Sequence, residues 1–228
     1  MRMKRLILAL ALTTMATPAL AADNALTPAE TRAGWVLLFD GKTTDGWRSF
    51  KQTTLGPGWR SEDGVLTPEP KLAKDILTRA DYANFDLKFE WRISRKGNSG
   101  VMYHVIPEGD QTYESGPEYQ ILDNARGEPP LEQAGGLFAL VAPTGAVTRP
   151  VGEFNQARLI VRHGKVQHWL NGKLVARYQI GSPDFNARVA ASKFKRWPQF
   201  ATGQTGAIAL QNHGDAVGFR NIKLRVLK

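Results

Sequence analysis

A short stretch around Glu118 places polar side chains in a pattern that could do chemistry. Alternation along an extended strand puts Glu118 and Gln120 on one face, and Tyr119 and Ile121 on the other. A carboxylate beside a carboxamide, with Asp123 at the strand end, suits the binding of sugar hydroxyls or the transfer of a proton. The alternative is an ordinary solvent-facing strand, which this stretch alone does not exclude.

A second candidate set lies near the end of the chain. In residues 207–213, two alanines alternate with apolar residues, and Gln211 and His213 follow on the side of the alanines. Small residues leave room for a ligand. If this stretch is a neighbour of the strand that carries Glu118 and Gln120, the four polar side chains line one groove. The alternative is that His213 is a turn residue hydrogen-bonded to the backbone.

The elements that must position these residues are short strands. Residues 85–93 alternate between large apolar and polar residues, which is typical of a strand with one buried face. Tight turns are predicted at Asp63-Gly64, His163-Gly164 and Asn171-Gly172. The pattern over residues 35–228 predicts an all-β sandwich or jelly roll with little helix, and its concave face is where we expect a ligand to bind.

The start of the chain has the features of a secretory signal peptide. Arg2, Lys4 and Arg5 form a basic start, an apolar run follows, and residues 19–21 offer a small-x-small cleavage site. We therefore predict that residues 1–21 are removed and that the mature protein is periplasmic or secreted. The apolar run is too short to span a bilayer as a helix, and no later stretch is long and apolar enough, so we expect no membrane partner.

The remaining residues divide into a short helical segment and one domain. In residues 22–34, Thr27 is a helix cap, Pro28 takes the first helical position and Glu30 the third. Residues 35–228 are long enough to bury the core of a single all-β domain.

Composition excludes several kinds of chemistry. The chain has no cysteine, so disulfides, thiolate nucleophiles and cysteine-bound metals are ruled out. The formal net charge is +9, and three of these positive charges lie in the predicted leader. The other basic residues are scattered apart from residues 193–197, which we expect to lie near a sugar or an acidic partner rather than to bind nucleic acid.

Several stretches together resemble one family, the 3-keto-disaccharide hydrolase domain, formerly known as DUF1080. They occur in the family's order: residues 98–104, 113–124, 152–155, 168–172 and 209–214, followed by 219–222. The resemblance covers about residues 34–227. It implies a concanavalin A-like jelly roll that cleaves small carbohydrate substrates, namely glycosides oxidised to a ketone at carbon 3 of the sugar. Two departures are Phe154, where the family often has Trp, and Asn212, where it often has Asp.

The implied chemistry needs a base, an acid and a stabiliser of an enolate. A 3-ketone acidifies the proton on carbon 2, and the enolate left by its removal can expel the substituent on carbon 1 before water adds back. Glu118 is the expected base, and His213 the expected acid or enolate stabiliser. The expected substrate-binding residues are polar or aromatic: Asn98, Tyr103, Gln120, Asp123, Trp169 and Gln211. The aromatic members, and Trp197 as a further candidate, are equally typical of a core.

Alternatives remain open at this point. The sequence requires no cofactor, although Glu118, Asp123 and His213 could ligate a divalent metal ion. A non-catalytic carbohydrate-binding jelly roll would use the same polar residues without turnover. An ordinary glycosidase of this fold class would place carboxylates at alternate strand positions, a pattern that Gln120 and Leu122 interrupt.

Overall fold

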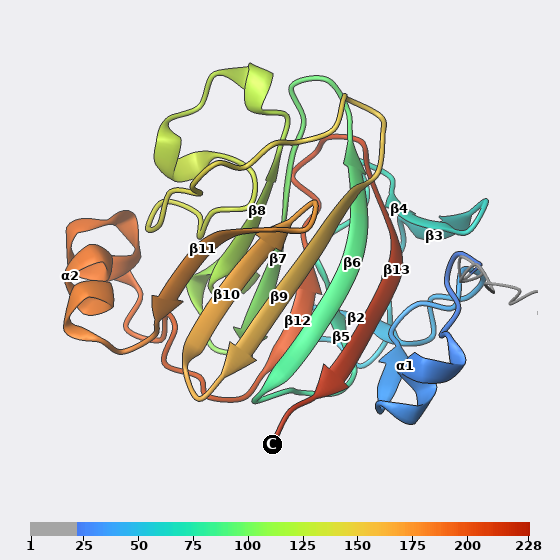
Figure 1. Ribbon diagram of the computed structural model, residues 1–228, viewed down its shortest axis with the longest axis horizontal. Helices are drawn as coiled ribbons and strands as arrows, with labels where there is room; N and C mark the ends of the chain where they lie inside the picture. Colours follow the sequence, from blue (N-terminus) through green and yellow to red (C-terminus); the bar gives the residue numbers. More distant parts are fainter. Residues whose placement is uncertain (1–21) are drawn as a thin grey trace, which may run out of the picture.

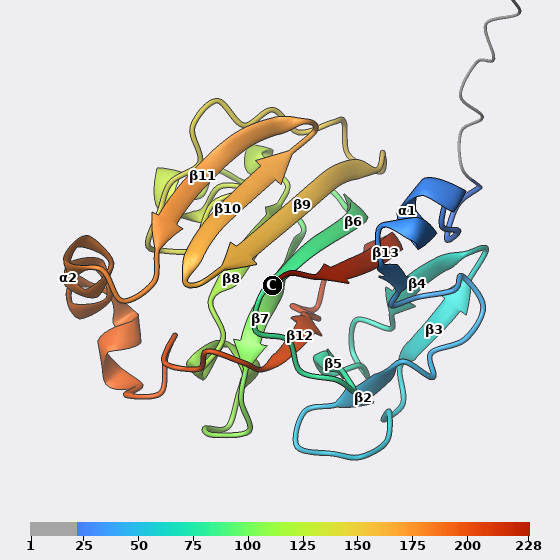
Figure 2. The same ribbon diagram turned by 60° about the horizontal axis from the view of Figure 1, so that its bottom comes forward.

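The computed structural model describes residues 22–228, and within them the strands form two antiparallel sheets packed face to face (Figures 1 and 2). The large sheet has eight strands, in the order β11-β10-β9-β6-β13-β4-β3, and β1 also pairs with β13. The small sheet has five, in the order β2-β5-β12-β7-β8. The prediction of an all-β jelly-roll sandwich is confirmed. The predicted signal peptide and export concern residues 1–21, which lie outside the described residues, so both stay predictions.

The strand bounds are as follows. The large sheet contains β1 (Trp35–Leu37), β3 (Trp59–Glu62), β4 (Val65–Pro68), β6 (Phe85–Ile93), β9 (Asn155–Arg162), β10 (Lys165–Leu170), β11 (Lys173–Gln179) and β13 (Val217–Val226). The small sheet contains β2 (Trp47–Ser49), β5 (Ile76–Thr78), β7 (Asn98–Val105), β8 (Glu118–Leu122) and β12 (Ala207–Leu210).

The core lies between the two sheets and is built by simple alternation. On β6, every second residue from Phe85 to Ile93 is buried against the small sheet, as the sequence pattern predicts. Tyr119 and Ile121 of β8 enter the same core, so Glu118 and Gln120 must lie on the outer face of the small sheet.

Tight turns fix the register of the hairpins. Asp63 and Gly64 adopt φ values of 50° and 76°, and Asn171 and Gly172 adopt 48° and 81°. Two successive residues at positive φ are the signature of the type I′ turn, which matches the twist of the strands it joins. The predicted hairpins β3–β4, β9–β10 and β10–β11 are all present.

Residues 23–32, which we call the N-terminal clasp, are bonded to β13 in the middle of the large sheet. Helix α1 (Pro28–Arg32) begins with a capping box between Thr27 and Glu30, the residues that mark a helix start in the sequence. Just before it, the backbone N–H of Asn24 donates to Asn221 Oδ1 (2.6 Å), and the N–H of Asn221 donates back to Asn24 Oδ1 (2.9 Å). These bonds tie residues 197 positions apart.

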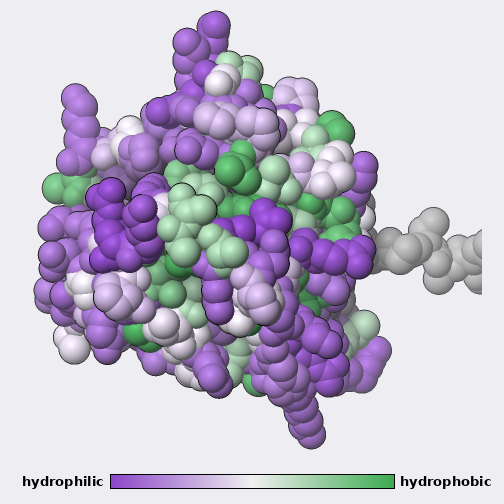
Figure 3. Space-filling view, turned by 90° about the vertical axis from the view of Figure 1, so that its left-hand side faces the viewer, coloured by the Kyte–Doolittle hydropathy of each residue, from purple (hydrophilic) through white to green (hydrophobic). Residues whose placement is uncertain are grey.

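The chain has little helix, as expected, but one helix beyond this region was not predicted. Helix α2 (Pro183–Ala191) covers one end of the sandwich, where Figure 3 shows apolar side chains in the middle of a mostly hydrophilic face. Ser182 caps α2 and Pro183 takes its first position, the same kind of signal that marks α1. Four short 3₁₀ helices complete the described chain: η1 (Thr112–Glu114), η2 (Asn124–Arg126), η3 (Pro130–Glu132) and η4 (Lys193–Arg196). No helix within residues 22–228 is long and apolar enough to cross a membrane.

Candidate active site

A row of polar residues crosses the outer face of the small sheet. Gln120 on β8 lies opposite Gly100 on β7. The backbone N–H of Gln211, directly after β12, donates to the carbonyl of Gly100 (3.0 Å). Leu210 lies opposite Ile76, so Gln211 and Asp75 are the next pair along the two chains. We call Gln120, Gly100, Gln211 and Asp75 the polar row.

The assumed pairing of the Glu118 and Gln211 strands does not occur, because β7 lies between β8 and β12. Gly100 on β7 nevertheless lets the two sides meet, since it carries no side chain. The carboxyl group of Glu118 leans over it so closely that a Cβ atom at Gly100 would lie 1.9 Å from Glu118 Oε1. Glu118 itself is only 6% exposed. Within the described residues its carboxyl group takes part in no hydrogen bond or ion pair, so it is free to act on a ligand.

The surroundings of Glu118 favour its protonated form. Burial, followed by the nearby negative charge of Asp75, raises the pKa of Glu118 to about 8, with Glu132 adding to the repulsion. The positive charge of Lys193 acts in the opposite direction. A carboxyl group with a pKa near neutrality is suited to give and take a proton during a reaction.

Asp75 is the second carboxyl group of the site, and sequence reasoning missed it. Its Oδ1 accepts from the backbone N–H of Asn212 (3.0 Å), and its Oδ2 accepts from the hydroxyl of Thr112. Burial raises the pKa of Asp75, although these two bonds and the charge of His213 oppose the effect. His213 is exposed, so it lies at the rim of the site.

Two buried carboxamide oxygens in the polar row lack partners. Gln120 Oε1 and Gln211 Oε1 are both buried and accept no hydrogen bond from any group in residues 22–228. The amide nitrogen of Gln120, in contrast, donates to the Glu132 carbonyl (3.1 Å) and to Asn98 Oδ1 (3.4 Å). Leaving a buried acceptor unpaired costs stability, so such atoms suit a ligand that brings hydroxyl donors. Three predicted substrate-binding residues, Asn98, Gln120 and Gln211, thus lie together with Glu118.

An aromatic and basic edge borders this site along β8. Phe138 lies opposite Glu118, and its backbone N–H donates to the Glu118 carbonyl (3.1 Å). Lys193 Nζ lies 4.3 Å from the centre of the Phe138 ring. Trp197, one of the predicted stacking candidates, follows η4 and packs edge-on against Tyr113 at 5.5 Å between ring centres. The basic stretch noted in the sequence therefore lies beside the candidate site.

Tyr103 does not belong to this site. It is fully buried between the sheets, and its hydroxyl lies 2.5 Å from that of Tyr178, which in turn lies 2.9 Å from His168 Nε2. The reason is strand phase: Val101 and Tyr103 of β7 face the core, whereas Gly100 faces outward. Tyr103 is a core residue, the alternative that the sequence left open.

The side chains of Trp169 and Asp123 also do not join the polar row. Trp169 is on β10 of the large sheet, on the opposite side of the sandwich. Asp123 Oδ2 accepts from the backbone N–H of Lys96 (2.7 Å), and its Oδ1 accepts from that of Ala125 (3.1 Å). Asp123 therefore shapes the turn that follows β8 rather than offering free oxygens to a substrate.

The set of metal ligands considered from the sequence does not fit the geometry. Both carboxylate oxygens of Asp123 are already engaged by backbone N–H groups. Among residues 22–228, no group of three or more His, Asp or Glu side chains is placed to hold a metal ion.

The two departures from the family pattern lie outside the polar row. As alternation predicts, the side chain of Asn212 points away from it and donates to the carbonyls of Pro70 (3.0 Å) and Ala73 (2.8 Å). The guanidinium of Arg220 lies 4.0 Å from the centre of the Phe154 ring, on the large sheet.

Comparisons with known proteins identify relatives of this chain. A family model described as the 3-keto-alpha-glucoside-1,2-lyase-like domain matches residues 34–225. A 3-keto-disaccharide hydrolase of Bacteroides thetaiotaomicron is 30% identical, over 85% of this chain and 79% of that protein. A solved structure from Parabacteroides distasonis, provisionally described as a glycosyl hydrolase, has a TM-score of 0.84 and 34% identity, covering 91% of this chain and 100% of the other. A second one from the same organism has a TM-score of 0.68 and 26% identity, covering 85% and 99%.

Proposed function

Since this chain belongs to the 3-keto-alpha-glucoside-1,2-lyase-like domain family, we propose that it cleaves glycosides whose sugar carries a ketone at carbon 3. The relatives support a carbohydrate-active, glycosidase-like enzyme, and the oxidised substrate is the finer step of the proposal. One observation carries it: in the part of the chain that the structure describes, the buried carboxyl group of Glu118 makes no hydrogen bond, and the amide oxygens of Gln120 and Gln211 beside it accept none.

Glu118 would act as the base in a stepwise elimination and hydration. Its carboxylate takes the proton from carbon 2, and the electron pair of that C–H bond forms the enolate of the 3-ketone. The enolate expels the substituent on carbon 1, which leaves as an alcohol after taking a proton. Water then adds across the double bond, with its oxygen on carbon 1 and a proton on carbon 2. The net reaction is hydrolysis.

The neighbouring residues have roles that follow from their chemistry. Gln120 and Gln211 would accept hydrogen bonds from sugar hydroxyls and hold the ring against Glu118. Lys193 would lower the energy of the developing negative charge, because its own positive charge already acts on Glu118. His213, at the exposed rim, is the proposed proton donor to the leaving group.

A direct assay tests the proposal. A 3-keto disaccharide and its unoxidised parent are each incubated with the protein, and the released monosaccharides are measured by chromatography. We expect release from the oxidised sugar only, because only the ketone acidifies the proton on carbon 2. Cleavage of the parent at a similar rate would point to an ordinary glycosidase. Saturable binding of the ketosugar without any product would instead identify a binding module.

The activity should depend on pH through Glu118. Because its pKa is raised to about 8, the carboxylate form becomes more abundant as the pH rises toward 8, and kcat/KM should rise with it and level off above that value. Asp75→Asn removes a repulsive charge, so the rising limb should move to lower pH by roughly one unit. The measurement is a pH profile of kcat/KM for both proteins on the 3-keto disaccharide. An activity that falls as the pH rises through 8 would make Glu118 an acid instead.

A further inference from the structure

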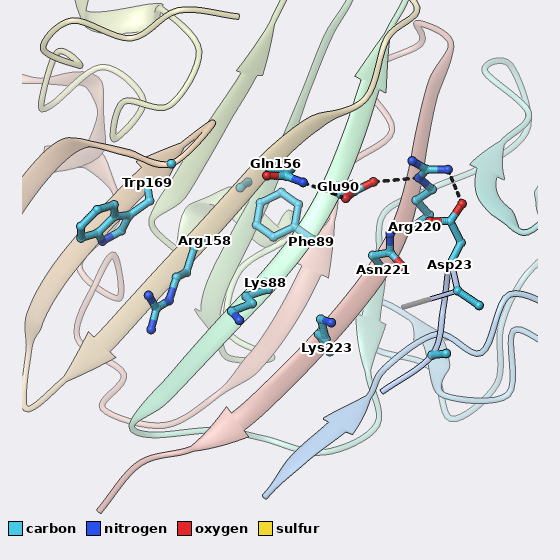
Figure 4. A pocket seen from close by; sticks show the side chains of 14 residues that line it. Asp23, Lys88, Phe89, Glu90, Gln156, Arg158, Trp169, Arg220, Asn221 and Lys223 are labelled. Atoms are coloured by element: carbon cyan, nitrogen blue, oxygen red, sulfur yellow. Dashed lines mark hydrogen bonds and ion pairs between the residues drawn. The ribbon is translucent and has the colours of Figure 1, made fainter. Parts of the chain in front are cut away.

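A hollow of about 700 Å³ lies on the outer face of the large sheet, on the opposite side of the sandwich from Glu118 (Figure 4). The N-terminal clasp forms one of its walls, where Asp23 pairs with Arg220. Trp169 lies at the other end. The hollow plays no part in the proposed chemistry, and the residues that line it therefore need a separate explanation.

Strand register arranges one line of side chains along the floor of this hollow. Trp169 lies opposite Arg158, Arg158 opposite Lys88, and Lys88 opposite Lys223. These four residues belong to β10, β9, β6 and β13, which are successive neighbours in the large sheet. Because adjacent strands are about 4.8 Å apart, the line extends for roughly 14 Å. We call it the cationic line.

Like charges face each other along this line. Lys88 lies between Arg158 and Lys223, and directly opposed like charges destabilise a sheet. Burial lowers the pKa of Lys88, and the charges of Arg158 and Lys223 lower it further, although Glu30 and Asp86 oppose the effect. Glu30 Oε1, which lies 3.8 Å from Lys88 Nζ and 2.6 Å from Lys223 Nζ, offsets part of this repulsion, and an anion bound over Lys88 would relieve more of it.

Two cations of the line are more exposed than their acidic partners. Asp86, which pairs with Arg158, has a side chain that is 1% exposed, and Glu30, which pairs with both Lys88 and Lys223, is 15% exposed, the same as Lys223. Lys88 and Arg158 are 39% and 37% exposed. In the middle of the hollow a ligand therefore meets Lys88 and Arg158 first, whereas Asp23 and Glu90, both paired with Arg220, lie at the end near the N-terminal clasp.

We infer that this hollow is a second saccharide-binding site, which takes an acidic saccharide such as a chain of uronic acids. The face of a sugar ring would pack on Trp169, whose Nε1–H is already satisfied by Gln167 Oε1 (3.1 Å) and whose ring is the part left to a ligand. The carboxylates would lie over Lys88 and Arg158. Gln156, which also lines the hollow, supplies hydrogen-bonding groups for hydroxyls.

Titration calorimetry with trigalacturonate, and with an uncharged trisaccharide of the same length, tests this site. We expect the acidic saccharide to bind more tightly, with an affinity that falls as salt is raised. Trp169→Ala and Lys88→Gln should each weaken binding by about tenfold or more. The control is Lys165→Gln, which removes a cation from β10 outside the hollow and should bind like the wild type. Equal affinity for the two saccharides, or unchanged affinity in both variants, overturns the inference.

The same variants separate this site from the proposed catalytic function. Trp169→Ala should turn over the 3-keto disaccharide at the wild-type rate, because it lies on the other sheet. A thermal melt of each variant shows whether the fold is retained. Loss of trigalacturonate binding with turnover retained supports two independent sites, whereas tight binding with no turnover would contradict only the catalytic proposal.

Discussion

Replacing Glu118 with glutamine should lower the turnover of a 3-keto disaccharide by about 10²-fold or more while leaving the fold intact. Glutamine keeps the shape of the side chain, so it still fits over Gly100. It cannot accept the proton from carbon 2, and the elimination loses its base. Since the carboxyl group of Glu118 makes no bond within the described residues, this change removes no structural interaction.

Two measurements make the Glu118→Gln result decisive. Binding of the unreacted ketosugar, followed by calorimetry under conditions of negligible turnover, should change little because Gln120 and Gln211 remain. A matched control, Glu153→Gln, alters an exposed glutamate in the loop that precedes β9 and should leave kcat unchanged. If Glu118→Gln retains wild-type turnover, Glu118 is not the base.

Gly100→Ala should lower turnover by a similar factor, although it replaces no ionisable group. A methyl group at this position would lie 1.9 Å from Glu118 Oε1 and 2.6 Å from its carboxyl carbon, so the Glu118 side chain must move away. A misplacement of about 1 Å at a reacting group can cost about 10²-fold in rate, and we expect a loss of that order. Gly100 is in a strand without the positive φ that would itself penalise alanine.

The control for Gly100→Ala is Gly218→Ala on the large sheet. Its added methyl group would lie 2.7 Å from Val65 Cγ1, so it should destabilise the fold to a comparable degree. Turnover measured well below both melting temperatures should fall only for Gly100→Ala. Equal losses of turnover in both variants would mean that crowding acts through stability, and the role assigned to Gly100 would be wrong.

The parts of the site that could be predicted from sequence are those set by strand alternation. Alternation placed Glu118 and Gln120 on one face of β8, and it also placed Gln211 outward on the continuation of β12. The same argument explains why Tyr103 faces the core, because its distance from Gly100 along β7 is odd. Helix α2 was missed although Ser182 and Pro183 carry the signal used for α1.

Other parts of the site could not be predicted, because they depend on which distant strands become neighbours. Asp75 and Phe138 join the Glu118 region only through the order of the small sheet and through the bridge between Tyr119 and Leu137. No local spacing relates them. Trp169 was expected to bind the substrate but lies on the other sheet, and the sequence could not show this because an outward-facing aromatic residue gives the same pattern on either sheet.

The position of β13 constrains the order in which the protein can fold. It is the last strand of the described chain, yet it lies inside the large sheet between β6 and β4, and it also pairs with β1 near the N-terminal clasp. Until residues 217–226 are available, β6 and β4 have no partner on that side and present open edges. Strands that are synthesised early must therefore wait for the strand that is synthesised last. This non-local pairing slows folding and lengthens the time during which the open edges can aggregate.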